Sequence, residues 1–324
     1  MSGTPGVTTT GSQAHASHRL GLIYGASAYV LWGFFPLYFA LLLPASPVEI
    51  LSERFVFSLV FMAVVLTATR SWSALAPVVR HRRQMLLVCC AAVLIAVNWG
   101  TYIWAVNNGD VVEASLGYFV NPLVLVVIGV VVLGERLRPL QWTAVGIATL
   151  AVAVLTFGYG KLPWIALVLA FSFAGYGLIK KVNAIDPKAS LTLETAVASP
   201  FALAYLVVLQ VSGALVLFHH STATTALLMG TGVITAVPLL MFGAAANRIP
   251  LSTMGLLQYL TPMIQFVIGV WVVDEPMPPA RLAGFAIVWL ALAVFTFDGL
   301  RQRNRNRSAR RASAQDDASV EAPI

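Results

Sequence analysis

The sequence predicts an all-α integral membrane protein with ten transmembrane helices, arranged as two inverted repeats of five helices each. Of its 324 residues, 59% are hydrophobic and only 10% are charged, whereas a soluble domain carries about 25% charged residues. So little charge cannot cover a soluble surface, so the apolar surface must face lipid. The second observation is a repeat at an offset of 140 residues: Pro122 and Pro262 each lie in an apolar run, and Glu135 and Glu275 follow them at the same distance.

Windows of about 20 apolar residues are long enough to cross a bilayer as a helix. The chain contains ten such windows, at residues 20–43, 48–69, 84–106, 112–133, 140–158, 162–180, 191–216, 224–246, 253–273 and 280–298. The segments between them are turn-like, for example Pro44–Pro47, Asn107–Asp110 and Pro276–Pro279, because proline, glycine and asparagine interrupt helices.

Loop charges set the predicted orientation. With ten helices and a cytoplasmic N-terminus, the inner side receives 17 of the 20 lysines and arginines, while Lys161 and Arg281 fall outside and Arg54 falls within a helix. Cytoplasmic loops carry such an excess of positive charge. We therefore expect a membrane protein with both termini cytoplasmic, with a disordered N-terminal tail over residues 1–19 and a basic C-terminal tail over residues 299–324.

The two halves are predicted to insert in opposite directions. Five helices per half is an odd number, so the second repeat (162–298) is upside down relative to the first (20–158). Inverted repeats supply two interconvertible states when the halves exchange conformations, as in many secondary transporters. The alternative is an old duplication that is retained for packing alone.

Several function classes are disfavoured. Much of the formal net charge of +7 comes from tail arginines, and a basic segment just beyond a helix contacts anionic lipid; lipids are expected partners and nucleic acid is not. The chain has no phosphate-binding loop and no His-Glu-x-x-His motif. The adjacent Cys89 and Cys90 cannot form a framework disulfide or a metal cage. We expect no catalytic residues, metal or cofactor.

Several motifs resemble RarD-type permeases, which belong to the EamA family of the drug/metabolite transporter superfamily. They are Asn98-Trp99, Trp104–Asn108, Glu113–Pro122, Gly134–Arg136, Leu169–Ala174, Tyr176–Leu178 and Val237–Leu240. The resemblance covers roughly residues 20–300 and implies ten helices, two EamA repeats and solute export at the plasma membrane. The family name implies an association with chloramphenicol sensitivity or resistance, while the superfamily handles amino acids, nucleotide sugars, phosphorylated sugars and drugs.

Ionisable residues inside a membrane are costly and tend to face a cavity or a partner. Glu49, Glu53 and Arg54 lie near the outer end of the second predicted helix, Glu113 opens the fourth, and Glu194 lies near the inner end of the seventh. We hypothesise that Arg54 pairs with Glu113 or Glu53 at an outer gate, where a proton or a substrate anion competes. The alternatives are a permanent structural ion pair, or groups that reach the interface, which we favour for Glu49. The offset of 141 makes Glu53 and Glu194 candidate equivalents.

Aromatic and amide side chains within the apolar windows form a second candidate set. They are Trp32, Tyr38, Asn98, Trp99, Tyr102, Tyr118, Asn121, Gln258, Tyr259 and Gln265. Buried amides need hydrogen-bond partners and aromatic rings offer flat apolar walls, a mixture that suits an amphipathic organic solute. Asn98, Tyr102 and Ala105 are spaced to share one helix face. The alternatives are interhelical hydrogen bonding and interface anchoring.

Prolines form the third set. Pro36, Pro122, Pro238 and Pro262 fall well inside predicted helices, where each removes a backbone hydrogen bond. The repeat relation of Pro122 and Pro262 favours a shared hinge in the fourth and ninth helices; the alternative is a static kink. Glu135 and Glu275 are interpreted as structural.

These features together favour a transporter that exports a small organic solute by alternating access, driven by a proton gradient through Glu113 or Glu53. A gradient-independent facilitator or exchanger is the first alternative. A lipid-handling protein, a membrane enzyme or a sensor is the second.

Overall fold

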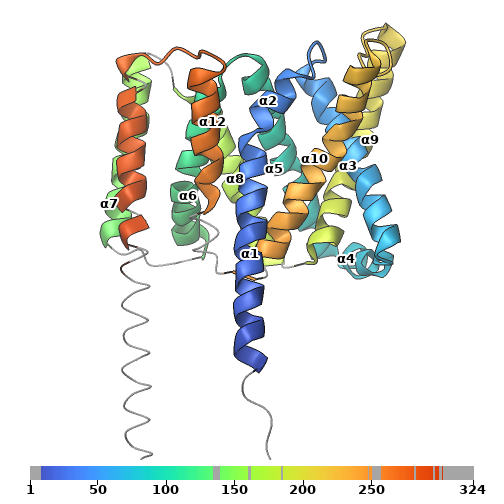
Figure 1. Ribbon diagram of the computed structural model, residues 1–324, viewed down its shortest axis with the longest axis horizontal. Helices are drawn as coiled ribbons and strands as arrows, with labels where there is room; N and C mark the ends of the chain where they lie inside the picture. The colour runs from blue at the N-terminus through green and yellow to red at the C-terminus, as the bar shows by residue number, and fades with distance from the viewer. Residues whose placement is uncertain are drawn as a thin grey trace, which may run out of the picture. The chain divides into compact units, whose positions relative to one another are not determined.

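The computed structural model describes residues 9–133, 139–159, 162–183, 185–246, 248–249, 257–280, 282–294, 296–298 and 301, and every regular element that it assigns there is helical (Figure 1). The helices are α1 (Thr9–Gly33), α2 (Phe35–Ala40), α3 (Pro47–Ala68), α4 (Leu75–Arg80), α5 (Arg82–Asn107), α6 (Val111–Leu133), α7 (Pro139–Tyr159), α8 (Trp164–Asn183), α9 (Pro187–Ser212), α10 (Thr222–Ala246) and α12 (Leu260–Trp271), with a short 3₁₀ turn at Trp72–Ala74.

Five of the described segments are long and apolar enough to cross a membrane: His18–Ala40, Pro47–Ala68, Arg82–Asn107, Pro187–Ser212 and Thr222–Ala245. Shorter apolar helices cover Trp142–Val154, Trp164–Lys180, Leu260–Trp271 and Leu282–Asp298. The prediction of an all-helical, multi-pass membrane protein is confirmed at this level.

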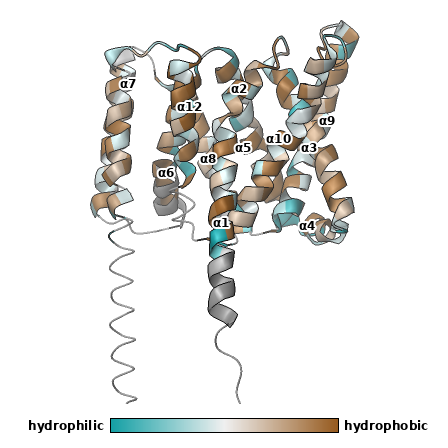
Figure 2. Cartoon of the chain, viewed as in Figure 1, coloured by the Kyte–Doolittle hydropathy of each residue, from teal (hydrophilic) through white to brown (hydrophobic). Residues whose placement is uncertain are grey.

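The outer faces of the long helices are apolar, as Figure 2 shows. Val64 on α3 is 62% exposed, and on α9 Phe201 is 78% and Val211 83% exposed. Large apolar side chains standing out along a whole helix have no favourable place in water. They are placed as lipid-facing side chains must be.

The chain forms two compact units, each drawn from both halves of the sequence. The larger one comprises residues 1–128 and 163–277, and the smaller one residues 129–162 and 278–324. In the larger unit, α3 packs against α9 and α10, α5 packs against α8, and α1 packs against α10 and α12. Its main hydrophobic cluster includes Phe39, Ile103, Leu169 and Leu228. In the smaller unit, which contains α7, the rings of Phe285 and Trp289 lie 6.0 Å apart.

Local sequence sets the ends of α9, and it moves them from the predicted range of 191–216. The side chain of Asp186 accepts hydrogen bonds from the backbone N–H groups of Lys188 (2.9 Å) and Ala189 (3.2 Å), and Pro187 occupies the first turn, a position that proline favours. Gly213 ends the helix with φ of 71°, a conformation that glycine adopts without strain. The helix therefore runs from Pro187 to Ser212.

The prediction of a disordered tail over residues 1–19 needs correction for its second half, because α1 begins at Thr9. No proline or glycine occurs between Ser12 and Leu20, and extending an existing helix costs far less than nucleating one. Residues 1–8, most of the predicted basic tail (302–324), and Glu135 lie outside the described residues.

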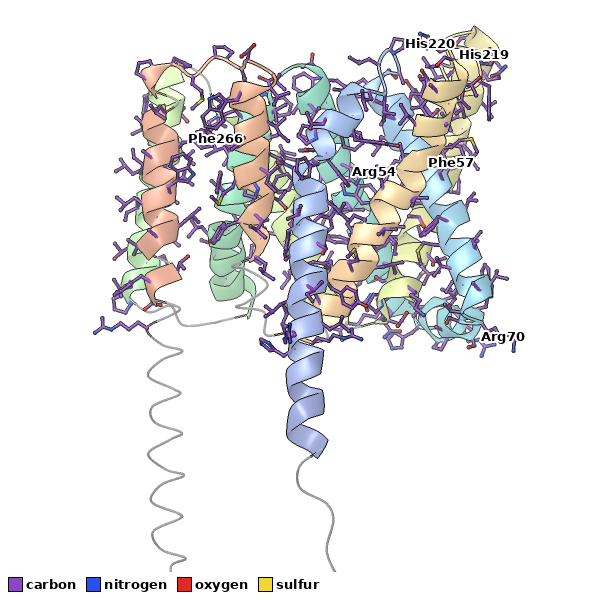
Figure 3. All side chains as sticks on the ribbon, in the orientation of Figure 1. Arg54, Phe57, Arg70, His219, His220 and Phe266 are labelled. Carbon is purple, nitrogen blue, oxygen red and sulfur yellow. The ribbon has the colours of Figure 1, made fainter. Side chains whose placement is uncertain are left out.

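Close approach of α10 to α3 requires a glycine. A Cβ atom added to Gly232 would lie 2.3 Å from the carbonyl oxygen of Phe57 and 2.4 Å from its carbonyl carbon; Figure 3 labels Phe57 on α3. Backbone cannot move aside as a side-chain tip can, so the helices must separate if any larger residue is present.

We predict that Gly232→Ala destabilises the protein by about 1–3 kcal/mol, the usual cost of overpacking. The matched control is Gly177→Ala on α8, where an added Cβ meets no atom within 4 Å and alanine favours the helix by up to about 1 kcal/mol. Thermal unfolding in detergent measures both. Equal melting temperatures for the two variants would contradict the packing described here.

Candidate functional site

A cavity of about 50 Å³ lies within the larger unit. Its lining is Tyr29, Trp32, Phe35, Arg54, Ile95, Asn98, Trp99, Tyr102, Tyr118, Phe173, Leu239, Gln258, Thr261 and Gln265. One water needs roughly 10–15 Å³ of such space, so the cavity holds a few waters or a small solute. Half of its lining residues are aromatic, and its one charged residue is Arg54.

One wall of the cavity is made by a break in the first membrane segment. The helix is interrupted at Phe34, between α1 and α2, and Pro36 stands at the start of α2. Since proline has no N–H, the carbonyl of Trp32 loses its usual helical partner. The side-chain Nε2 of Gln265, on α12, donates to that carbonyl at 3.1 Å. The prediction that Pro36 lies well inside a helix is therefore wrong. Pro36 lies at a break in the helix, and Trp32 and Phe35 beside this break line the cavity.

A second break faces the first. Residues 257–258 are helical, Tyr259 forms a turn, and α12 begins at Leu260. Pro262 consequently lies in the first turn of α12 rather than deep within a helix. The hydroxyl of Thr261 donates to the carbonyl of Tyr29 on α1 at 2.7 Å. Two interrupted helices are thus joined across the cavity by side chains that reach backbone carbonyls.

Asn98 on α5 anchors another part of the lining. Its Nδ2 donates to the carbonyl of Leu169 and to the hydroxyl of Ser172, both at 3.0 Å. The hydroxyl of Tyr118 donates to Asn98 Oδ1 at 3.3 Å. These bonds satisfy a buried amide and hold α5, α6 and α8 together, so the role of interhelical hydrogen bonding applies to Asn98 as well as that of lining.

Asn121 and Gln258 form a buried pair. Gln258 Nε2 donates to Asn121 Oδ1 at 2.9 Å, and Asn121 Nδ2 donates to the carbonyl of Ala170 at 2.9 Å. Asn121 precedes Pro122 on α6 as Thr261 precedes Pro262 on α12, and each donates to a carbonyl of α8 or α1. The acceptors Ala170 and Tyr29 are 141 positions apart, so the two bonds follow the repeat in the sequence.

Arg54, on α3, is 2% exposed and lies inside the bundle (Figure 3). Its Nε donates to the hydroxyl of Thr235 at 2.6 Å, and its Cζ lies 3.9 Å from the ring centroid of Trp99. The rings of Phe35 and Phe39 lie 5.4 and 5.5 Å from Cζ. Within the described residues it forms no ion pair, so the expected pairing with Glu113 or Glu53 is absent from this conformation.

The carboxylates near Arg54 in sequence have other placements. Glu113 Oε1 accepts a hydrogen bond from the backbone N–H of Ile165, near the start of α8, at 3.2 Å. Glu49 is buried rather than interfacial, because its Oε1 accepts from the backbone N–H groups of Val216 (2.7 Å) and Leu217 (3.3 Å). Glu53 is fully buried, and neither of its carboxylate oxygens has a hydrogen-bond partner within the described residues.

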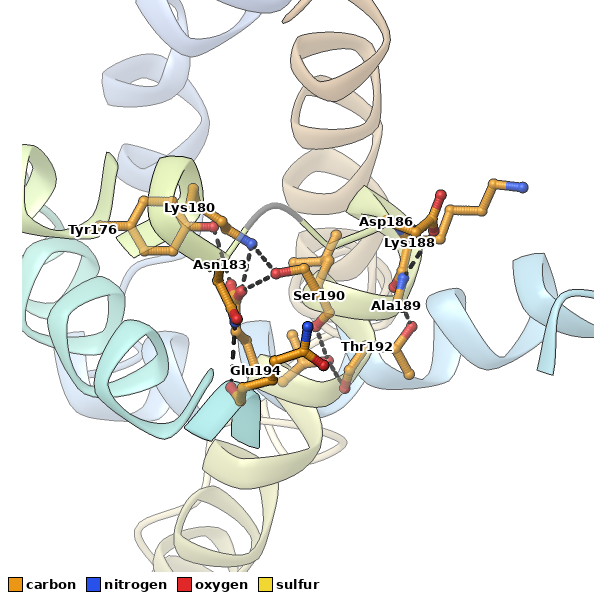
Figure 4. Close-up of polar contacts among 12 residues, drawn as sticks. Tyr176, Lys180, Asn183, Asp186, Lys188, Ala189, Ser190, Thr192 and Glu194 are labelled. Atoms are coloured by element: carbon orange, nitrogen blue, oxygen red, sulfur yellow. Dashed lines mark hydrogen bonds and ion pairs between the residues drawn. The ribbon is translucent and has the colours of Figure 1, made fainter. Parts of the chain in front are cut away.

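Glu194 belongs to a polar cluster that joins α8 to α9 near their connection (Figure 4). Lys180 Nζ contacts both Glu194 Oε1 and Ser190 Oγ. The hydroxyl of Tyr176 donates to Glu194 Oε2 at 3.0 Å, and that of Ser190 donates to Oε1 at 2.6 Å. Lys180 is one of the 17 basic residues that the charge pattern assigns to the inner side, and its ion pair with Glu194 was not predicted. The available indication was its position fourteen residues before Glu194, separated from it by a short Asn-Ala-Ile-Asp-Pro segment.

The structure brings eight of the predicted residues to the cavity: Trp32, Arg54, Asn98, Trp99, Tyr102, Tyr118, Gln258 and Gln265. Glu53, Glu113, Asn121, Tyr259 and Glu194 are not part of its lining. The lining that sequence reasoning missed is Tyr29, Phe35, Ile95, Phe173, Leu239 and Thr261. The lining role of Phe35 could have been inferred from Pro36, because a proline there interrupts the helix next to Phe35.

Residues 19–157 match the model of the EamA-like transporter family. A protein named RarD from Streptomyces exfoliatus is 51% identical over 93% of this chain and 96% of its own length. An uncharacterized transporter, YojE, from Bacillus subtilis is 42% identical over 91% of this chain and 99% of its own. A protein named chloramphenicol-sensitive protein RarD from Pseudomonas aeruginosa is 30% identical over 87% of this chain and 95% of its own.

We predict that Lys180→Met lowers stability by about 1–3 kcal/mol, because it leaves the carboxylate of Glu194 buried without its cation. The double variant Lys180→Met/Glu194→Leu should recover part of this loss, because no unpaired charge remains. Melting temperatures of the single and double variants form a double-mutant cycle. Strictly additive effects would refute the ion pair as a stabilising contact.

Proposed function

Because the chain belongs to the EamA-like transporter family as a RarD-type member, we propose that this membrane transporter exports a small organic solute, a metabolite or a drug such as chloramphenicol, by proton-coupled alternating access. The observation that carries the proposal is the cavity between two interrupted helices, lined by Arg54, amides and aromatic rings. Transporters bind solutes at such breaks, where freed backbone groups and side chains face a protected space.

The ten-helix arrangement of two inverted repeats, 20–158 and 162–298, is part of the proposal. Its support is the pairing of helices: α1 packs on α10 as α8 packs on α5, and α3 packs on α10 as α9 packs on α5. Each pair becomes the other when 140 is added to or subtracted from the residue numbers. The hydrogen bonds of Asn121 and Thr261 follow the same relation. Pro122 and Pro262, which follow these two residues, are the proposed hinges.

With both termini in the cytoplasm of a plasma-membrane protein, Glu53 lies toward the outside and Glu194 toward the inside. The cluster of Lys180, Ser190, Tyr176 and Glu194 then closes the cytoplasmic side. Opening that side requires these contacts to break, which a change in the charge of Glu194 or competition by solute can supply. Export would end with the opposite change at the outer end.

Glu53 is the proposed proton carrier, in preference to Glu113. A carboxylate taken out of water without a partner is costly. Glu53 is buried with no hydrogen-bond partner among the described residues, an environment that suits the neutral, protonated form. Glu113 already accepts a backbone hydrogen bond from α8, which gives it a structural task. A conformational change that wets Glu53 would release its proton.

The testing experiment uses inside-out vesicles that contain the protein. Accumulation of chloramphenicol, several amino acids and a sugar phosphate is measured with and without a protonophore. The proposal expects accumulation of at least one class that collapses with the proton gradient. Equilibration that ignores the protonophore would favour a facilitator, and movement of no solute would contradict the proposal of export.

We predict that Glu53→Gln preserves the fold, since glutamine imitates a protonated carboxyl group, but abolishes gradient-driven accumulation while exchange of solute continues. Glu113→Gln is the matched control and should lower thermal stability with coupling retained. If accumulation by Glu53→Gln still collapses with a protonophore, Glu53 is not the proton carrier.

A further inference from the structure

We propose that the cavity binds a small organic acid, whose carboxylate docks on Arg54 and whose neighbouring hydroxyl or ammonium group donates to Gln265. This rests on the proposed function, and names the class of solute that the site recognises. Among the described residues, the buried Arg54 has no anionic partner and the Oε1 of the buried Gln265 has no donor, and both residues line the cavity.

The guanidinium of Arg54 has unused donors. Of its five N–H groups, the Nε–H is taken by Thr235, and no hydrogen bond to the terminal nitrogens occurs within the described residues. The ring of Trp99 lies close to Cζ and those of Phe35 and Phe39 further away, so the aromatic groups screen the charge without using its N–H donors. Those donors can form two parallel N–H···O hydrogen bonds to the two oxygens of a carboxylate.

No described residue supplies the counter-charge in this conformation. A buried guanidinium is stable when it is paired, and the cation–π contact with Trp99 offsets only part of the cost. Glu49 and Glu113 are engaged by backbone N–H groups. Glu53 precedes Arg54 in α3, so its side chain projects about 100° away from that of Arg54 around the helix axis. Glu53 does not line the cavity. An anionic solute would complete the pair.

Gln265 contributes the second half of the recognition site. Its Nε2 donates to the carbonyl of Trp32, which can only accept, and to the hydroxyl of Tyr102 at 2.9 Å. These bonds fix the orientation of the amide. Gln265 is 2% exposed, and its Oε1 has no hydrogen-bond partner among the described residues. A ligand that carries a donor would satisfy this acceptor.

Size narrows the class further. The cavity of about 50 Å³ falls well below the roughly 300–1,000 Å³ of drug-sized pockets. In this conformation it suits an acid with few heavy atoms, such as a short hydroxy acid or amino acid. A larger solute would require the walls around the two helix breaks to open.

The test measures binding by purified protein in lipid nanodiscs, without a gradient. Glycolate (acid and hydroxyl), acetate (acid alone) and glycolamide (hydroxyl, uncharged) are titrated at matched ionic strength while thermal unfolding is followed. At equal concentration, a ligand that binds the folded state more tightly raises the melting temperature more. We expect glycolate to stabilise most, acetate less, and glycolamide not at all. Equal stabilisation by glycolamide, or none by either acid, would overturn the proposal.

Variants locate the effect. Arg54→Gln should weaken glycolate binding by at least about tenfold, the equivalent of about 1.4 kcal/mol, and Arg54→Lys should retain part of it. Arg248→Gln is the matched control, because Arg248 is an exposed arginine whose Cζ lies 5.7 Å from the ring of Tyr24; it should bind as the unaltered protein does. Unchanged glycolate binding by Arg54→Gln would refute the site.

If Arg54→Gln does not fold, the variant Gln265→Glu still tests whether the cavity binds an acid. It adds a carboxylate to the same lining and should abolish acid binding, whereas unchanged binding would overturn the proposal. Because binding is measured apart from transport, the two proposals fail separately. Acid that binds through Arg54 but does not move in vesicles would contradict export alone, while export of neutral solutes without acid binding would contradict the site alone.

Discussion

Polar groups within a membrane must find partners inside the protein, and this constraint shapes the larger unit. Pro36 removes a helical hydrogen bond, and Gln265 supplies a donor to the freed carbonyl of Trp32. Asn121 and Thr261 reach carbonyls on neighbouring helices. Among the described residues, the polar groups without a hydrogen-bond partner include the terminal nitrogens of Arg54, the Oε1 of Gln265 and the carboxylate of Glu53, besides the amide of Asn107 and the hydroxyl of Ser58. The first two line the cavity, and we place function there for that reason.

Much of the fold could be predicted from the composition and from the proline, glycine and asparagine residues that separate the apolar windows. Apolar windows located the membrane helices, because twenty apolar residues in a chain with so little charge have few other uses. The bounds of α9 were less accurate, since the window weighed hydropathy and not the capping of Asp186 or the left-handed Gly213. The types of lining residue were also predictable, because amides and arginine are rare in such helices. Their partners were not: the choice of Thr235 over Glu113 for Arg54, and the pairing of Lys180 with Glu194, depend on tertiary packing.

Two ends of the larger unit differ in a way that suits alternating access. Glu53 and Glu194, the proposed equivalents in the two repeats, lie on α3 and α9, which pack together (Figure 1). Glu194 is held by a lysine, a serine and a tyrosine, while Glu53 has no hydrogen-bond partner among the described residues. An inverted repeat allows the two environments to be exchanged. On this account, the unpaired carboxylate and the unpaired guanidinium are two parts of one cycle, one for the proton and one for the solute.

The central claim is that Arg54 binds an anion that none of the described residues provides. An experimental structure in lipid, determined with and without glycolate, tests this most directly. The account predicts that Arg54 contacts Thr235 and no protein carboxylate in either state, with the acid within hydrogen-bond distance of the guanidinium when glycolate is present. A structure in which Arg54 is paired with Glu53 or Glu113, and in which glycolate is absent from the cavity or lies elsewhere, would contradict it.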